Sequence, residues 1–220
     1  MGSTTRGEHM SSPHAFQADL DALASLKQKW QARTSAVHCE LCSRALAEEH
    51  SHLIEIATLR IVCSCQACAL LFDGTSGLRY SRIPRDCTLI EPFAMNDVAW
   101  NSLGVPINLA FFVLSSAAGK TVAMYPSPAG PTQADLSQDV WEEIVRGCST
   151  LKQLRPDVEA LLVNRLGTAS ECYIAPIDRC YELAGLIRKH WQGFSGGEAL
   201  WRELEGFFNR LRNQSQRAGH

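Results

Sequence analysis

The chain has 220 residues, 45% hydrophobic side chains and a formal net charge of −2. This hydrophobic content supports a folded core, which excludes disorder along the whole chain. The slightly negative charge excludes a global basic field of the kind that holds nucleic acid or an anionic membrane.

Nine cysteines bear on the cellular compartment. In a chain of this length they can indicate secretion, but the N-terminus lacks the charged region and the roughly 7 to 15 apolar residues of a signal peptide. We expect instead a reducing cytoplasm in which a metal holds some of the thiols. The longest apolar stretch, Ile107–Leu114, is too short to span a bilayer, so no membrane insertion is expected.

The N-terminal segment divides into two parts. Residues 1–12 are expected to be a leader added for expression and are set apart from the fold. Over residues 13–36 apolar side chains recur at helical spacing, which predicts an amphipathic helix. These side chains are Phe16, Leu20, Leu23, Leu26 and Trp30.

Four cysteines form the strongest motif of the chain. Two C-x-x-C pairs, Cys39 with Cys42 and Cys65 with Cys68, are separated by 22 residues. This spacing is typical of one tetrahedral metal site built from two knuckles. A zinc-ribbon or rubredoxin-like module is therefore predicted over residues 37–72, with short strands at 53–56 and 59–62.

The remainder predicts an α+β body over residues 86–212. A Gly-, Ser- and Arg-rich linker, Asp73–Arg85, is expected to precede it, and a disordered tail over 213–220 to follow. Helices are predicted at 96–103 and 139–146, and strands at 107–115, 121–125, 160–164 and 172–176. Prolines at 126, 128 and 131 are expected to stop the second strand.

Two helices are predicted near the C-terminus. Asp178 is the expected N-cap of the first, and Ser195 with Glu198 has the spacing of a capping box for the second. The last helix carries an apolar stripe that predicts core packing. The fold class predicted from all these elements is α+β: an antiparallel sheet covered by helices, with a small metal module near the N-terminus.

Four thiolates suit zinc or a single iron. Four protein ligands around zinc leave no open coordination position, so such a site is structural and cannot activate water. Rubredoxin-type knuckles usually have glycine after the second cysteine, where this chain has Ser43 and Ala69. The difference favours structural zinc, with iron as the alternative.

Further residues near the motif have alternative interpretations. Cys63 shares a strand face with Cys65 if the strand continues, so it is an alternate ligand, a redox partner or simply a packed strand residue. Histidines 38, 50 and 52 are interpreted as solvated, because four thiolates complete the coordination shell. Cys87, Cys148, Cys172 and Cys180 lack ligand spacing and are interpreted as packing residues.

No contiguous catalytic motif is found, so a non-catalytic role is favoured while an enzyme stays open. Gly119–Lys120–Thr121 lacks the glycine and the helix of a phosphate-binding loop. Asp157, Glu159, Asn164 and Arg165 are interpreted as capping residues at a sheet edge rather than a pocket.

Several segments resemble an uncharacterised bacterial family whose members are often encoded beside nickel-iron hydrogenase genes. The resemblance covers residues 37–212. The segments that carry it are His38–Cys42, Cys63–Phe72, Tyr125–Pro128, Ala160–Arg165 and Pro176–Tyr181. It implies a hydrogenase-associated accessory protein with a rubredoxin-like knuckle, and it supplies no catalytic residues.

Three functional hypotheses follow. The first is a non-catalytic metal-binding protein with zinc at the four cysteines, docking on a protein partner such as a nickel-iron hydrogenase or its maturation machinery. The second is a rubredoxin-like electron carrier with one iron at the same site. The third is a nucleic-acid-binding zinc ribbon, against which the acidic residues around the motif argue.

Overall fold

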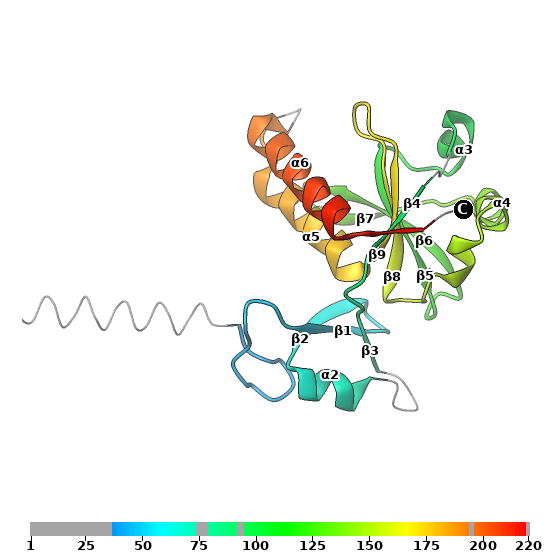
Figure 1. The fold of residues 1–220 in the computed structure, drawn as a ribbon. Helices are drawn as coiled ribbons and strands as arrows, with labels where there is room; N and C mark the ends of the chain where they lie inside the picture. The colour runs from blue at the N-terminus through cyan, green and yellow to red at the C-terminus, as the bar shows by residue number, and fades with distance from the viewer. Residues whose placement is uncertain (1–36, 74–78, 92–94, 194–195, 219–220) are drawn as a thin grey trace, which may run out of the picture.

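The protein is described by a computed structural model that covers residues 37–73, 79–91, 95–193 and 196–218. The expected leader and the expected helix over 13–36 lie outside these residues. Figure 1 shows a small module near the described N-terminus and a larger body. Each has its own sheet, of three and seven strands respectively. The predicted α+β class, with a mainly antiparallel sheet, is confirmed.

The module is a β-hairpin flanked by a third strand and a short helix. Its elements are β1 (Ser51–Glu55), β2 (Arg60–Ser64), α2 (Gln66–Phe72) and β3 (Tyr80–Arg82). Because side chains alternate along a strand, the hairpin has two different faces. Leu53 pairs with Val62 and packs with Ala69 and Tyr80 in the module core, whereas Ile54 joins the core of the body.

The linker expected over Asp73–Arg85 is wrong in part. β3 lies within it and pairs antiparallel with β1. Tyr80 closes the module core and Ile83 is buried in the body core. Burial of these two apolar side chains fixes the segment against both cores. The module therefore extends to Arg82, beyond the expected end at residue 72.

The body is built on one seven-stranded sheet in the order β10-β4-β9-β8-β5-β6-β7. All neighbouring strands are antiparallel except β10 and β4, which are parallel. The strands are β4 (Thr88–Ile90), β5 (Leu109–Ser115), β6 (Lys120–Ser127), β7 (Gly130–Ala134), β8 (Glu159–Asn164), β9 (Glu171–Pro176) and β10 (Gln216–Ala218). The four strands predicted for this region are all present.

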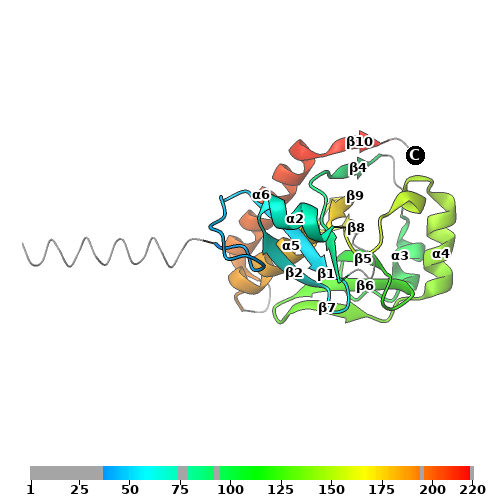
Figure 2. The same ribbon diagram turned by 90° about the horizontal axis from the view of Figure 1, so that it is seen from below.

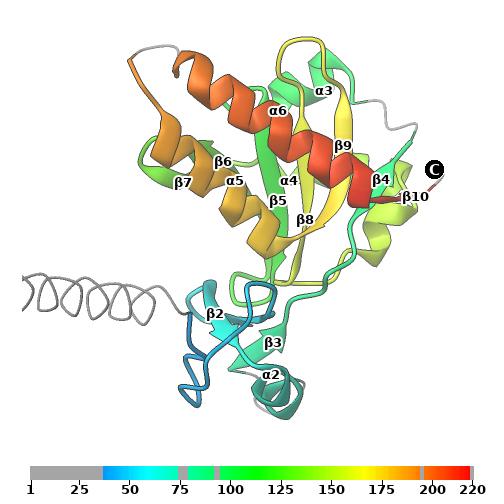
Figure 3. The ribbon, with the colours of Figure 1, turned by 60° about the vertical axis from the view of Figure 1, so that its left-hand side comes forward.

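Helices cover both faces of this sheet, as Figures 1 and 3 show. One face is covered by α5 (Ile177–His190) and α6 (Gly197–Gln214), and the other by α3 (Asp97–Ser102), α4 (Gln138–Gly147) and the 3₁₀ helix η1 (Thr150–Gln153). On β5, Phe111 belongs to the first core and Phe112 to the second. Phe112 stacks on Trp141 with ring centroids 4.8 Å apart. Figure 2 shows the same arrangement from below.

Two expectations about strand ends are corrected. The prolines do not end the pairing: Pro126 in β6 lies opposite Pro131 in β7. β7 is the edge of the sheet, where a missing N–H donor is tolerated. The expected disordered tail is also wrong, since residues 216–218 form β10 beside β4. There the chain finds backbone partners on an otherwise open sheet edge.

The starts of the last two helices also differ from expectation. Pro176 is the N-cap of α5, and Asp178 lies in the first turn. Gly196 is the N-cap of α6 at φ +85°, where an added Cβ would lie 2.6 Å from Leu200 Cδ2. Ser195, proposed for the capping box, lies outside the described residues. The predicted apolar stripe of α6 is buried, at Leu200, Leu204, Phe207, Phe208 and Leu211.

Among the described residues, no helix is both long enough and apolar enough to cross a bilayer.

Candidate metal centre

The four predicted cysteines lie together at one end of the module. Their Sγ atoms all lie within 4.8 Å of one another. Cys39, Cys65 and Cys68 are buried and Cys42 is exposed. The arrangement brings together two chain segments that the β1–β2 hairpin joins, and four thiols this close could hold one metal ion.

The first pair sits in a tight turn before β1. The Ser43 N–H donates to the Cys39 carbonyl at 2.7 Å, and the Cys39 N–H donates to the Arg44 carbonyl at 2.8 Å. Ser43 has φ +61°. The turn therefore keeps the left-handed conformation that glycine usually supplies, although the residue is serine.

The second pair is not a second knuckle of the expected kind. Cys65 is the N-cap of α2, and its Sγ accepts a hydrogen bond from the Cys68 N–H at 3.5 Å. Ala69, at the other position where a rubredoxin has glycine, lies inside this helix and is fully buried. The apolar run after Cys65 packs as a helix on the hairpin, so the second pair sits on a helical turn.

Burial, backbone donors and the neighbouring thiols shift the pKa values of these cysteines in opposite directions. Burial raises the pKa of the Cys39 thiol, but backbone N–H donors at Cys65, Leu41 and Cys42 outweigh it and bring the pKa to about 6. Burial, followed by the neighbouring thiols, raises the pKa of Cys68 to about 12. Adjacent thiolates repel one another, and a divalent cation at their centre would let all four ionise.

Cys63 is not part of this group. β2 ends at Ser64 and the chain turns into α2 at Cys65, so the alternation that would put Cys63 and Cys65 on one face is broken. The expectation that Cys63 serves as an alternate ligand of the four-cysteine site does not match its position. Its sulfur lies instead with the imidazoles of His50 and His52.

The histidines divide in the same way. His38 is exposed, and its backbone forms an isolated bridge to Ala45. His50 and His52 are partly buried, and their ring centroids lie 4.7 Å apart. The interpretation of these two as solvated is therefore wrong. The sequence does contain a signal for this group. Two histidines stand two residues apart just before one predicted strand, and a cysteine follows directly after the next.

The polar residues at the edge of the sheet do have structural roles. The Asp157 carboxylate accepts from the Ser116 N–H at 2.9 Å. Glu159 accepts from both the backbone and the guanidinium of Arg155, at 2.9 and 2.7 Å. The four remaining cysteines, Cys87, Cys148, Cys172 and Cys180, are buried in the body, as expected for packing residues.

Comparison with known proteins gives one result. No curated protein and no solved structure matches the chain. Residues 38–215 match the model of a family of unknown function, DUF5947. This range runs from the residue before Cys39 to the end of α6, and so includes the metal centre and nearly all of the body. The chain therefore belongs to the DUF5947 family of unknown function.

Proposed function

We propose that the protein is a non-catalytic zinc-binding protein of the cytoplasm whose zinc fixes the N-terminal module, and that the folded chain docks on a protein partner. The observation that carries the metal part is the gathering of four cysteine sulfurs within 4.8 Å of one another. Thiolates favour zinc, and four of them complete its tetrahedral shell. Such a site supplies folding energy and leaves no position for a water nucleophile.

The size of the module supports a structural role for the metal. Its own core consists of four buried side chains, Leu53, Val62, Ala69 and Tyr80. So few apolar contacts do not hold a small unit together without a disulfide or a metal. All nine cysteines lie within the described residues and are free thiols, so zinc is the cross-link that we propose between the turn and α2.

The test of the metal site is elemental analysis and a visible spectrum of purified protein, for the wild type and two variants. Cys42→Ser changes an exposed ligand, and Cys87→Ala changes a buried cysteine outside the cluster. We expect a colourless wild type, one zinc fewer per chain in Cys42→Ser, and an unchanged zinc content in Cys87→Ala. Equal zinc in wild type and Cys42→Ser would refute zinc binding at these four cysteines.

The proposed partner is a nickel-iron hydrogenase or its maturation machinery. This proposal rests on the resemblance of the Cys63–Phe72 and Pro176–Tyr181 segments to a family encoded beside hydrogenase genes. It is tested by purifying the tagged protein from its native host while hydrogenase is expressed. Enrichment of hydrogenase or maturation subunits over an unrelated tagged protein is expected, and their absence under all growth conditions would contradict the proposal.

A second candidate function is electron transfer by a single iron at the same sulfurs. Two observations favour it: the N–H···S hydrogen bond from Cys68 to Cys65, and the left-handed turn at Ser43. Backbone donors to cysteine sulfur tune the potential of iron–sulfur centres. Iron in the elemental analysis, with a visible absorbance that bleaches on reduction, would replace the zinc proposal with this one.

A further inference from the structure

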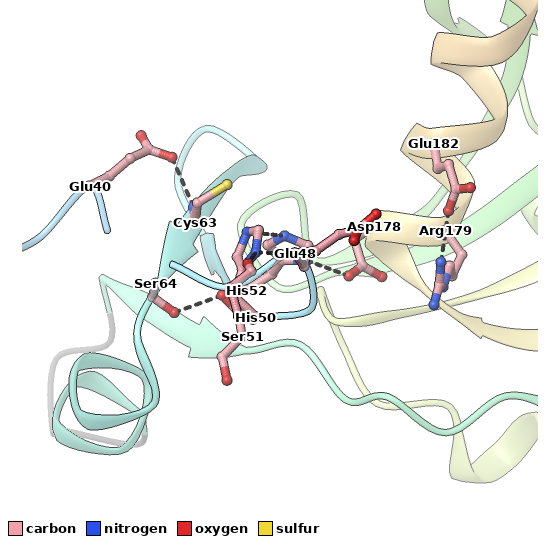
Figure 4. A network of polar contacts seen from close by, with 11 residues as sticks. Glu40, Glu48, His50, Ser51, His52, Cys63, Ser64, Asp178, Arg179 and Glu182 are labelled. Carbon is pink, nitrogen blue, oxygen red and sulfur yellow. Dashed lines mark hydrogen bonds and ion pairs between the residues drawn. The ribbon is translucent and has the colours of Figure 1, made fainter. Parts of the chain in front are cut away.

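A second group of metal-ligating side chains lies in the module where it faces Asp178 of the body (Figure 4). His52 on β1 pairs directly with Cys63 on β2, and His50 precedes β1. One ring nitrogen of each histidine and the Cys63 sulfur all lie within 4.8 Å of one another. Their side chains are partly buried, in contrast to the exposed His38.

Hydrogen bonds fix the tautomers of both imidazoles. His50 Nδ1 lies 3.0 Å from the Ala47 carbonyl and 3.2 Å from the Glu48 carbonyl. Carbonyl oxygens only accept, so this Nδ1 carries the hydrogen. His52 Nδ1 lies 2.7 Å from Asp178 Oδ2 and donates to that carboxylate. In each neutral ring the lone pair is therefore on Nε2.

These two Nε2 atoms face each other at 3.2 Å. Two bare lone pairs at this distance repel, so the arrangement requires a positive charge between them, either a shared proton or a metal ion. Two nitrogens bound to one tetrahedral zinc, with bonds of about 2.0–2.1 Å, lie about 3.3 Å apart. The observed separation matches this geometry, and the nearby thiol of Cys63 is a third ligand that a shared proton would not need.

We propose that His50, His52 and Cys63 bind a second metal ion of the zinc and copper class, with Asp178 as the residue that orients His52. Imidazole and thiolate both favour these metals over magnesium and calcium. A histidine that binds metal through Nε2 usually donates its other N–H to a carboxylate or a carbonyl. Both histidines of the group have that partner.

The second site differs from the four-cysteine site in its coordination. Three protein ligands leave a fourth position for water or an incoming ligand. His50 and His52 also line a cleft of about 710 Å³ between module and body, together with Glu48, Glu49 and Asp178. Arg85, Arg179 and Arg210 line the same cleft, so its charge is mixed, and a cation is favoured by the ligand atoms themselves. The site is therefore an open, exchangeable one, where the first is closed.

Asp178 gives the site a link to the body. It lies in the first turn of α5, whereas all three ligands belong to the module. Its Oδ2 is committed to His52, and its Oδ1 is buried without a hydrogen-bond partner among the described residues. Metal at the histidines would thus couple the module to α5 through one hydrogen bond.

The test is a titration of metal-free, reduced protein with Co²⁺, followed by visible absorbance and equilibrium dialysis. The wild type is expected to bind two equivalents. His50→Ala and Cys63→Ser should each bind one and keep the four-thiolate spectrum. Cys42→Ser should lose that spectrum and, because the ligands of the second site lie in the same module, the second equivalent with it. His38→Ala, an exposed histidine of the same module, is the matched control and should bind two.

A wild type that stops at one equivalent would overturn the proposal, as would two equivalents in both His50→Ala and Cys63→Ser. Failure of the second site is distinguishable from failure of the first, because the four-thiolate spectrum of His50→Ala and Cys63→Ser reports on the first site separately. Asp178→Asn should weaken the second equivalent about 10–100-fold, as loss of a ligand-orienting carboxylate does elsewhere.

A measurement on the folded wild type removes any dependence on variant stability. Zn²⁺ beyond the first equivalent should shift the ¹⁵N resonances of the His50 and His52 Nε2 atoms and leave His38 unchanged. Unmoved imidazole resonances, with one proton shared between the rings, would show that a proton and not a metal occupies the gap.

Discussion

The body and the module of this protein differ in what holds them together. The body buries aromatic and aliphatic side chains on both faces of a seven-stranded sheet, with Phe111 on one side and Phe112 on the other. The module has a core of four side chains and, beside it, a separate cluster of three buried cysteines. The hydrophobic effect is sufficient for the body, whereas the module needs a cross-link.

The two regions meet at β1, which serves both. Leu53 and Ile54 are adjacent and fully buried, yet Leu53 packs in the module core and Ile54 in the body core. The two faces of β1 therefore belong to different regions. The Leu53 face packs in the module, whose fold depends on the metal, and the Ile54 face packs in the body, whose fold depends on hydrophobic burial. Each prediction below separates these two contributions.

The largest effect is expected from Cys65→Ser. Serine is a good N-cap, so α2 keeps its capping oxygen while the site loses a thiolate. The metal should be lost and residues 37–73 should lose their fold, because the module then has no cross-link. The body should persist. Zinc content and amide NMR spectra check this, and collapse of the body resonances would contradict it.

The next largest effects come from the pair Leu53→Ala and Ile54→Ala. Both remove a fully buried side chain and should cost about 2–5 kcal/mol. Ile54→Ala should lower the melting temperature of the body, whereas Leu53→Ala should accelerate zinc loss and leave the body transition in place. Calorimetry with chelator competition measures both. Identical effects of the two variants would contradict the proposal that Leu53 stabilises the module and Ile54 the body.

The pH dependence of the two regions should have opposite signs. Acid protonates metal-binding thiolates, so the module should fail first as pH falls. In the body, burial raises the pKa of the Cys172 thiol from 9.0 to about 12. Because the folded pKa is the higher one, this stability is complete below pH 9 and is lost as pH rises towards 12.

At pH 10 the loss from Cys172 should be on the order of 1 kcal/mol, and Cys172→Ala should flatten the alkaline part of the stability profile. Urea unfolding from pH 7 to 10.5 measures this slope. An unchanged slope in Cys172→Ala would show that this thiol does not account for the alkaline loss.

The smallest effect is expected at Glu40, between the first two cysteines. One carboxylate oxygen accepts from the Cys63 N–H at 2.8 Å and the other pairs with Arg60 at 2.7 Å. The Cys63 N–H, and after it Arg60, lower the pKa of this carboxyl. Glu40→Ala should cost up to about 1 kcal/mol, and Glu40→Gln less, because it keeps an acceptor. Zinc release rates should follow that order; equal rates in the two variants would assign the role to the ion pair with Arg60, which both variants remove.

The sequence predicts what is local in this fold. The spacing of the four cysteines predicts the metal site, because each C-x-x-C pair places two ligands within one turn. The apolar run at 107–115 predicts a strand, and the apolar stripe at 200–211 predicts a helix, because the spacing of apolar residues along the chain follows the pattern of burial. These elements were found without knowledge of their neighbours.

Other features depend on partners that are distant in sequence. The sequence predicts Asp178 as an N-cap, but it lies in the first turn of α5 and its carboxylate accepts from His52, 126 residues away. The segment 216–218 is polar and becomes a strand only because β4 offers an edge. The second ligand group has no recognised spacing, because it is assembled from the start of β1 and the end of β2.

The central claim is that metal at the four cysteines holds the module but not the body. Hydrogen exchange of the wild type before and after chelation tests it most directly. The account predicts that residues 37–73 and β3 lose protection on chelation while β5 and β8 keep theirs. Loss of protection in β5 and β8 together with the module, or unchanged protection in the module, would contradict it.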